Sequence, residues 1–237
     1  HDVEIPGEEF FFSHGHLHGG PAPVRQMSTT WTQDNETSLF ILNPRVKETN
    51  IYDSAGNRAR KEITYEQFDL GNGMSCHLPS DVFEYAADAA TKLRSMHTSY
   101  NMSVTYKNVR ILGLVSEKRV YEGDVTGALA SKELYFYDND NGSTSIVGAD
   151  APVQHDNAYG ASFLDRGNPS SVVRYDVTDP NNAALAITLS RSKYNTAGAI
   201  VSSKDALGHE TTISYADVFS DGTPRNTLAY PPTVTDP

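Results

Sequence analysis

The feature that most constrains this chain is a short pattern, Asp or Asn followed three residues later by Gly, which recurs between extended segments. An Asp or Asn at the first corner of a type I turn can accept hydrogen bonds from the backbone ahead, and a Gly three positions later can adopt a positive φ. Each copy therefore predicts a tight reversal of an extended chain. The copies lie at Asp53 and Gly56, Asp124 and Gly127, Asn195 and Gly198, and Asp205 and Gly208, with a related polar run from Asn139 to Gly142.

Composition favours short strands over long helices. The 237 residues include 13 Tyr, 17 Gly and 12 Pro, and only 38% of the chain is hydrophobic. Such a balance is typical of strands joined by many turns. We therefore predict an all-β fold, with successive antiparallel β-hairpins that form an extended, curved or spiralling repeat sheet. Residues 1–45 are expected to form an N-terminal β segment with a His-rich loop, and residues 46–237 the hairpin repeats.

Charge narrows the classes of partner. The net charge of −11 disfavours nucleic acid and anionic membrane, because no run of Lys and Arg is available to neutralise phosphates. No apolar run approaches the length of a bilayer span. The single Cys76 excludes an internal disulfide. The chain starts at His1 and ends at Val234-Thr-Asp-Pro237, where an expected strand passes into a turn. We therefore expect a piece of a longer polypeptide.

Local patterns give more detailed expectations. Residues 28–42 are predicted to form a hairpin, residues 69–80 a polar connection, and residues 109–115 an extended segment. Residues 81–100 carry apolar residues near helical spacing, which favours a helix. However, Tyr85 precedes Asp88 by three residues, as Tyr121 precedes Asp124. This shared register favours strand, turn and strand over a helix.

Four segments resemble the units of Rhs or YD-repeat proteins. Those units run as Tyr-Asp, two residues, Gly-Arg or Gly-Asn, a strand and a recurring Tyr. The residue after Gly is here Asn57, Ala128, Ala199 or His209 instead of Arg, and the unit spacing is irregular. The resembling segments are Ile51–Asn57, Lys193–Gly198, Asp205–His209 and Ile213–Tyr215.

The resemblance implies a long β-hairpin ribbon, often spiralling into a hollow shell, in large secreted or cell-surface bacterial proteins. Teneurins and insecticidal toxin complexes are relatives of this kind. The shell encloses or displays a separate effector domain, so the expected partners are neighbouring repeats of the same polypeptide, with an encapsulated effector or surface glycans as further possibilities. The resemblance carries no catalytic residue and no cofactor, and the chain is expected to be a structural scaffold and not an enzyme.

Two other functions stay open. The first is a carbohydrate-binding β module in which Tyr side chains and Trp31 stack on sugars. The second is a metal-dependent hydrolase using His14, His16 and His18, which would share one face of an extended segment and could bind zinc. Glycines between and after these histidines favour a solvated loop instead. The neighbouring pair Cys76 and His77 would point to opposite faces of a strand, which argues against a thiol nucleophile with an adjacent base.

Overall fold

The computed structural model describes residues 25–35, 40–140, 143–144, 156–160, 162–217, 219–225, 227–231 and 233–236. Strands dominate, with one short helix, α1 (Val104–Asn108), and two 3-10 turns, η1 (Asn157–Tyr159) and η2 (Ala183–Leu185). The strands are β1 (Arg25–Thr32), β2 (Arg45–Asp53), β3 (Arg58–Gly71), β4 (Met74–Tyr85), β5 (Lys92–Tyr100), β6 (Val115–Glu122), β7 (Leu129–Tyr137), β8 (Asn139–Asp140), β9 (Ser143–Thr144), β10 (Pro169–Arg174), β11 (Ile187–Tyr194), β12 (Ile200–Asp205), β13 (Glu210–Ser214) and β14 (Thr233–Thr235).

Hydrogen bonding links twelve strands in the order β1-β2-β3-β4-β5-β6-β7-β10-β11-β12-β13-β14, while β8 and β9 form a separate pair. The order follows the sequence, and neighbouring strands run antiparallel. Sequence neighbours can pair in this way through short reversals. The predicted all-β fold of successive antiparallel hairpins is confirmed.

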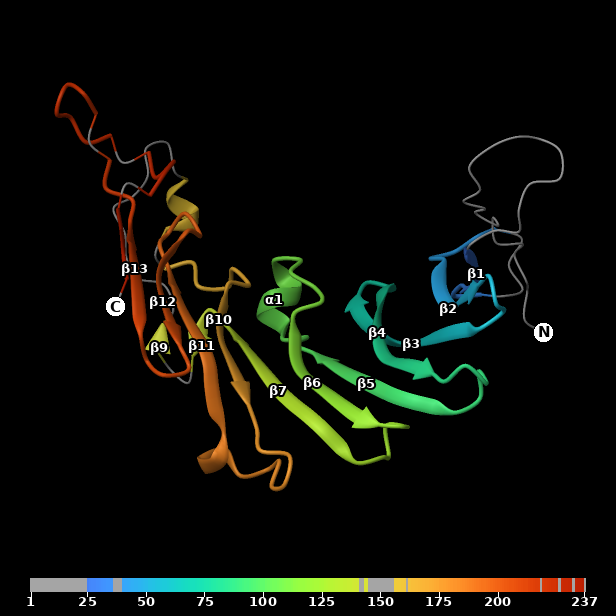
Figure 1. Cartoon of the computed structure of the whole chain (residues 1–237). Coiled ribbons are helices and arrows are strands. Elements are labelled where there is room, and N and C mark those ends of the chain that lie inside the picture. The colour runs from blue at the N-terminus through green and yellow to red at the C-terminus, as the bar shows by residue number, and fades with distance from the viewer. Residues whose placement is uncertain are drawn as a thin grey trace, which may run out of the picture. The chain divides into compact units, whose positions relative to one another are not determined.

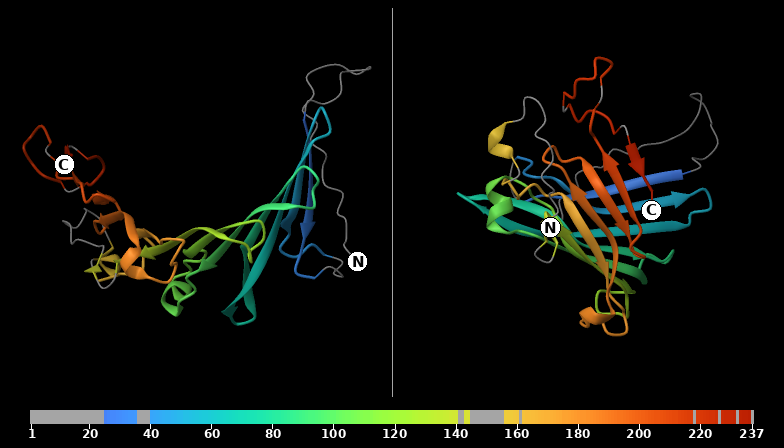
Figure 2. Two further views of the ribbon diagram at one scale, coloured as in Figure 1. Left: turned by 60° about the horizontal axis from the view of Figure 1, so that its bottom comes forward. Right: turned by 90° about the vertical axis from the view of Figure 1, so that its left-hand side faces the viewer.

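Contacts divide the chain into two units, which we describe separately. The first unit comprises the chain up to Thr98 together with Arg119–Ala130. The second comprises Ser99–Lys118 and the chain from Ser131 onward. In the first unit, β1 to β5 lie side by side (Figure 1). In the second, β10 to β13 lie side by side, as the orange and red ribbons show in Figure 2. The β1–β2 pairing crosses the boundary predicted after residue 45.

Three of the Asp/Asn-x-x-Gly turns share one set of hydrogen bonds. At Asn195, the side-chain oxygen accepts from the N–H groups of Ala197 and Ala199 at 3.0 and 2.9 Å, and the backbone carbonyl accepts from Gly198 at 3.0 Å. Gly198 has a φ of 82°. The same pattern of bonds occurs at Asp53, Ala55, Gly56 and Asn57, and at Asp205, Leu207, Gly208 and His209.

The fourth turn, at Asp124, is built differently. Gly127 donates its N–H to the Asp124 carbonyl at 2.7 Å, but the Asp124 side chain accepts from the adjacent Val125 N–H instead of the residues beyond it. Gly127 is required here for space, because a Cβ at this position would lie 1.9 Å from the carbonyl oxygen of Glu122. The sequence pattern alone does not distinguish this turn from the other three.

Residues 81–100 form the end of β4, a turn and β5, as the repeat register predicts. The Asp88 carboxylate accepts from the N–H groups of Ala90 and Thr91, both at 2.9 Å. Ala89, which follows Asp88 in the turn, has a φ of 57°, in the left-handed region that disfavours residues with a side chain. Strand pairing therefore overrides the helix propensity of this alanine-rich segment.

Three local predictions were wrong. Strand β1 pairs with β2 instead of forming a hairpin within residues 28–42, because none of the described residues between Thr32 and Arg45 belongs to a strand. Residues 69–80 belong to the β3–β4 hairpin, which reverses at Asn72 and Gly73, both with positive φ. An Asn-Gly pair is a strong hairpin signal that could have identified it. Residues 109–114 are irregular and follow α1.

Few apolar side chains are buried. Within the described ranges, the buried hydrophobic side chains are Phe83, Tyr106 and Tyr194, whereas Asn195 and Ser95 are buried polar residues. Large apolar side chains such as Leu207 and Phe40 are 82% and 77% exposed. Among the described residues, fully buried polar side chains therefore outnumber fully buried hydrophobic ones.

We expect opposite effects from exchanging Gly and Ala at two positive-φ turn positions. Gly198→Ala should lower the free energy of unfolding by about 1 kcal/mol, because no neighbour lies within 4 Å of the new Cβ and only backbone strain is added. Ala89→Gly should leave stability unchanged or raise it, because the strain is removed. Urea unfolding followed by circular dichroism measures both. A larger loss for Ala89→Gly than for Gly198→Ala would contradict the turn geometry.

Candidate functional site

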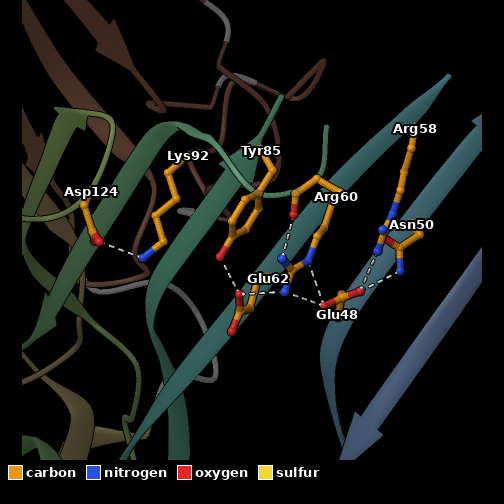
Figure 3. Close-up of polar contacts among 9 residues, drawn as sticks. Glu48, Asn50, Arg58, Arg60, Glu62, Tyr85, Lys92 and Asp124 are labelled. Carbon is orange, nitrogen blue, oxygen red and sulfur yellow. Dashed lines mark hydrogen bonds and ion pairs between the residues drawn. The ribbon is translucent and has the colours of Figure 1, made fainter. Parts of the chain in front are cut away.

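One face of β2, β3 and β4 carries a row of polar side chains that we call the charged ladder: Glu48, Asn50, Arg58, Arg60, Glu62 and Tyr85 (Figure 3). The strand register brings them together. Glu48 lies opposite Glu62 and Asn50 opposite Arg60, while Arg60 lies opposite Tyr85 on its other side. Because side chains alternate along a strand, directly paired residues share one face.

Arg60 offsets the repulsion between two carboxylates. Directly opposed Glu48 and Glu62 would repel. The Arg60 Nε donates to Glu48 at 2.8 Å and its Nη2 to Glu62 at 3.1 Å, so that one guanidinium bridges both carboxylates. Its Nη1 donates to the Ala89 carbonyl at 3.0 Å. The guanidinium also lies 4.2 Å from the centre of the Tyr85 ring, in cation–π geometry.

The remaining members of the charged ladder complete the network. Glu48 also accepts from the Asn50 side-chain amide at 2.7 Å and from Arg58 at 3.3 Å. The Tyr85 hydroxyl donates to Glu62 at 2.6 Å. Figure 3 shows these contacts as one continuous chain. Each carboxylate is thus held by several donors.

The network changes how two groups titrate. Burial alone would raise the pKa of Glu48, but hydrogen bonds from Asn50 and Arg60 and the charges of both arginines outweigh it and lower the pKa. For Tyr85, burial and the hydrogen bond to Glu62 raise the pKa to about 12. Near neutral pH the charged ladder therefore contains an ionised Glu48 and a protonated Tyr85, which suits a structural network better than proton transfer.

A second ion pair extends this face toward the turn after β6. The Lys92 Nζ donates to Asp124 at 2.8 Å and lies 4.0 Å from the centre of the Phe83 ring. The bond from Lys92 is the main cause that lowers the pKa of Asp124. The sequence pattern identified Asp124 only as a turn residue.

The second unit contains a different polar centre, the Asp138 cluster, which comprises Asp138, Tyr106 and the 166–168 segment. The buried Asp138 carboxylate accepts from the Tyr106 hydroxyl at 2.8 Å and from the N–H groups of Arg166, Gly167 and Asn168 at 2.8 to 3.0 Å. Burial and then the bond to Asp138 raise the pKa of Tyr106. One carboxylate thus fixes a loop that regular strand pairing does not reach.

A pocket of about 550 Å³ lies beside the Asp138 cluster, and we call it the Tyr159 pocket. The rings of Tyr159 and Phe163 meet edge to face, with centroids 5.1 Å apart. The lining includes Asn108, Ile111, Tyr159, Phe163, Asp165 and Arg166. Sequence reasoning did not bring these residues together, because no motif marks the distant segments that meet here.

The sequence singled out further candidate residues, of which the structure describes only some. His14, His16 and His18 lie outside the described residues, so the metal hypothesis stays a prediction. Among the residues that the structure describes, no group of three or more His, Cys, Asp or Glu is arranged to hold a metal ion. Trp31 is 39% exposed on β1. Burial raises the pKa of the half-buried Cys76 thiol, which disfavours a reactive thiolate.

Comparisons with known proteins do not identify a family. No family model matches the chain, and no curated protein matches it. Among solved structures, a porin-like protein from Bacteroides uniformis aligns with a TM-score of 0.34 and 10% sequence identity, over 85% of this chain and 81% of that one. Within the described part of the chain, no helix has both the length and the apolar character needed to cross a bilayer.

The charged ladder predicts a specific pH dependence. The lowered pKa of Glu48 stabilises the fold at pH values above the ordinary value of 4.5, and this contribution is lost as the pH falls through the folded-state pKa. Glu48→Gln should therefore lower the free energy of unfolding by about 1 to 3 kcal/mol at neutral pH and by less in acid. Urea midpoints measured from about pH 7 to about pH 3 test this.

Glu84→Gln is the matched control, because Glu84 pairs with Arg94 on exposed surface, where the two side chains are 44% and 58% exposed. We expect this control to change stability by less than about 0.5 kcal/mol. A Glu48→Gln effect that is equally small, or that does not vary with pH, would contradict the role of the network.

The Asp138 cluster predicts a loss of stability in the second unit. Asp138→Asn keeps the size of the side chain but turns an amide N–H₂ toward a donor, so we expect a loss of about 1 to 3 kcal/mol. Tyr106→Phe removes one donor and leaves three, and should cost less. Thermal unfolding of both variants provides the comparison. If Tyr106→Phe proved the more harmful change, Asp138 would not be the centre of this cluster.

Proposed function

We propose that this chain is a structural segment of a large secreted or cell-surface Rhs/YD-repeat protein. Its hairpins would form part of a wall or scaffold around or beside an effector domain. The observation that carries this proposal is the succession of antiparallel neighbours in chain order, interrupted only where β8 and β9 pair separately, and reversed at three places by the same hydrogen-bonded Asp/Asn-x-x-Gly turn. Repetition of one such unit is typical of arrays in which each repeat contacts its neighbours.

The distribution of side chains supports the same function. Within the first unit, the charged ladder ties adjacent strands to each other through side chains that remain on the sheet surface. In the second unit, strands β11 to β13 are likewise connected by short reversals. Few described apolar side chains are buried. A sheet of this kind supplies area and rigidity, which a wall needs.

The tyrosines fit this role as well. The Tyr65 hydroxyl donates to the Val46 carbonyl at 2.8 Å, and the Tyr194 hydroxyl donates to the Pro169 carbonyl at 2.7 Å. In both cases the hydroxyl satisfies a backbone carbonyl of the neighbouring strand. A recurring Tyr can therefore link adjacent strands of the sheet.

Hydrogen exchange tests the proposal. Strand β1 pairs with β2, and its other edge has no partner strand among the described residues. If the chain is one segment of a longer wall, the outward N–H groups of β1 should exchange slowly in the natural full-length polypeptide and rapidly in the isolated 237-residue chain. Mass spectrometry of β1 peptides from both proteins measures the difference.

The paired strands β3 and β4 provide the internal control, because both should be equally protected in the two proteins. Equal exchange at β1 in the full-length and the isolated chain would contradict the wall proposal. Loss of protection at β3 and β4 in the isolated chain would show instead that the segment does not fold alone.

A further inference from the structure

The Tyr159 pocket has features that a wall segment does not need. It lies entirely in the second unit, and its lining comes from the end of α1 with the residues just after it, and from Tyr159, Phe163, Asp165 and Arg166. Tyr159 is 51% exposed although it belongs to an aromatic pair. Its volume of about 550 Å³ is within the range of small-molecule sites.

The walls of the pocket are held in place. Arg166 donates from Nε to the Phe163 carbonyl at 2.7 Å, from Nη1 to the Thr196 carbonyl at 2.7 Å, and from Nη2 to the carbonyls of Tyr159 and Gly160. The N–H of Arg166 is bound in turn by the Asp138 carboxylate. The loop that carries both aromatic rings is therefore fixed before any ligand binds, which reduces the entropy cost of binding.

The polar groups of the pocket define the class of ligand. The Arg166 guanidinium already has four backbone carbonyls as acceptors and lies 5.5 Å from the centre of the Phe163 ring. A cationic ligand would therefore meet a positive charge beside the aromatic wall. An anionic ligand would meet the Asp165 carboxylate, which has no hydrogen-bond or ion-pair partner in the described structure. The two side-chain charges cancel, and a neutral ligand suits them best.

We propose that the Tyr159 pocket binds a neutral pyranose sugar. The apolar face of the sugar would pack on the exposed Tyr159 ring and on Ile111, while Asp165 and Asn108 would exchange hydrogen bonds with its hydroxyl groups. An aromatic surface with a carboxylate and an amide offers both a packing face and polar partners for one ligand. This inference does not depend on the wall proposal, and the lining of the pocket does not include Trp31.

Saturation-transfer NMR on the intact 237-residue chain tests the inference. Three probes are neutral pyranosides, namely maltose, cellobiose and methyl β-glucopyranoside. The fourth, tetramethylammonium, is the cationic probe. We expect transfer to the ring protons of at least one neutral pyranoside and none to tetramethylammonium. Transfer to no pyranoside, or stronger transfer to tetramethylammonium, would overturn the inference.

Variants locate the binding. Tyr159→Ala should weaken the affinity for the bound pyranoside roughly tenfold, because it removes the stacking surface. Asp165→Asn should weaken it severalfold while keeping the shape of the pocket. Tyr230→Ala is the matched control, because Tyr230 is an 82% exposed tyrosine of the same unit outside the pocket. Circular dichroism melts establish that each variant is folded.

The outcomes distinguish the Tyr159 pocket from a sugar site on β1. An unchanged affinity in Tyr159→Ala and Asp165→Asn would overturn the assignment, and a loss of binding in Trp31→Ala would place the sugar on β1 instead. If Tyr159→Ala unfolds, Asp165→Asn decides the question by itself. The wall proposal is tested by exchange at β1, so either proposal can fail without the other.

Discussion

The structure depends on pairing between strands that follow one another in the chain. A strand with few apolar contacts gains stability mainly from its backbone hydrogen bonds and from side chains of the neighbouring strands. Each strand therefore needs its partner in correct register, and the turn between them sets that register. Asn195, which is 1% exposed and binds two backbone N–H groups, shows how strongly one turn residue can be integrated.

Polar networks specify a single arrangement of the strands and loops, a role that a hydrophobic core usually has. In the first unit, the Glu48 and Glu62 carboxylates lie opposite each other and would repel without Arg60 between them. In the second, Asp138 binds three consecutive backbone N–H groups of a loop. Such groups specify one arrangement because alternatives would leave buried charges unpaired. The same rigidity supports the Tyr159 pocket, where a fixed loop presents an aromatic pair.

The sequence predicted the fold class well and the individual connections less well. The strand, turn and strand of residues 81–100 was correct because the spacing of Tyr85 and Asp88 outweighs the helix propensity of the alanines. The β3–β4 hairpin was missed because its polar residues resemble a loop when no apolar alternation marks a buried face. The sequence did not identify the charged ladder, because its cross-strand hydrogen bonds join side chains 8 to 23 residues apart.

The sequence by itself determined that the chain reverses often, because Asp or Asn with Gly three residues later forms a turn through bonds within five residues. It also determined the prevalence of strands. Only the tertiary structure decided which side chains meet across strands, that Gly127 serves for space instead of a positive φ, and that Tyr159 and Phe163 lie beside Ile111 in one pocket. Local bonds depend on adjacent residues, whereas these contacts depend on the register of distant segments, which short patterns do not encode.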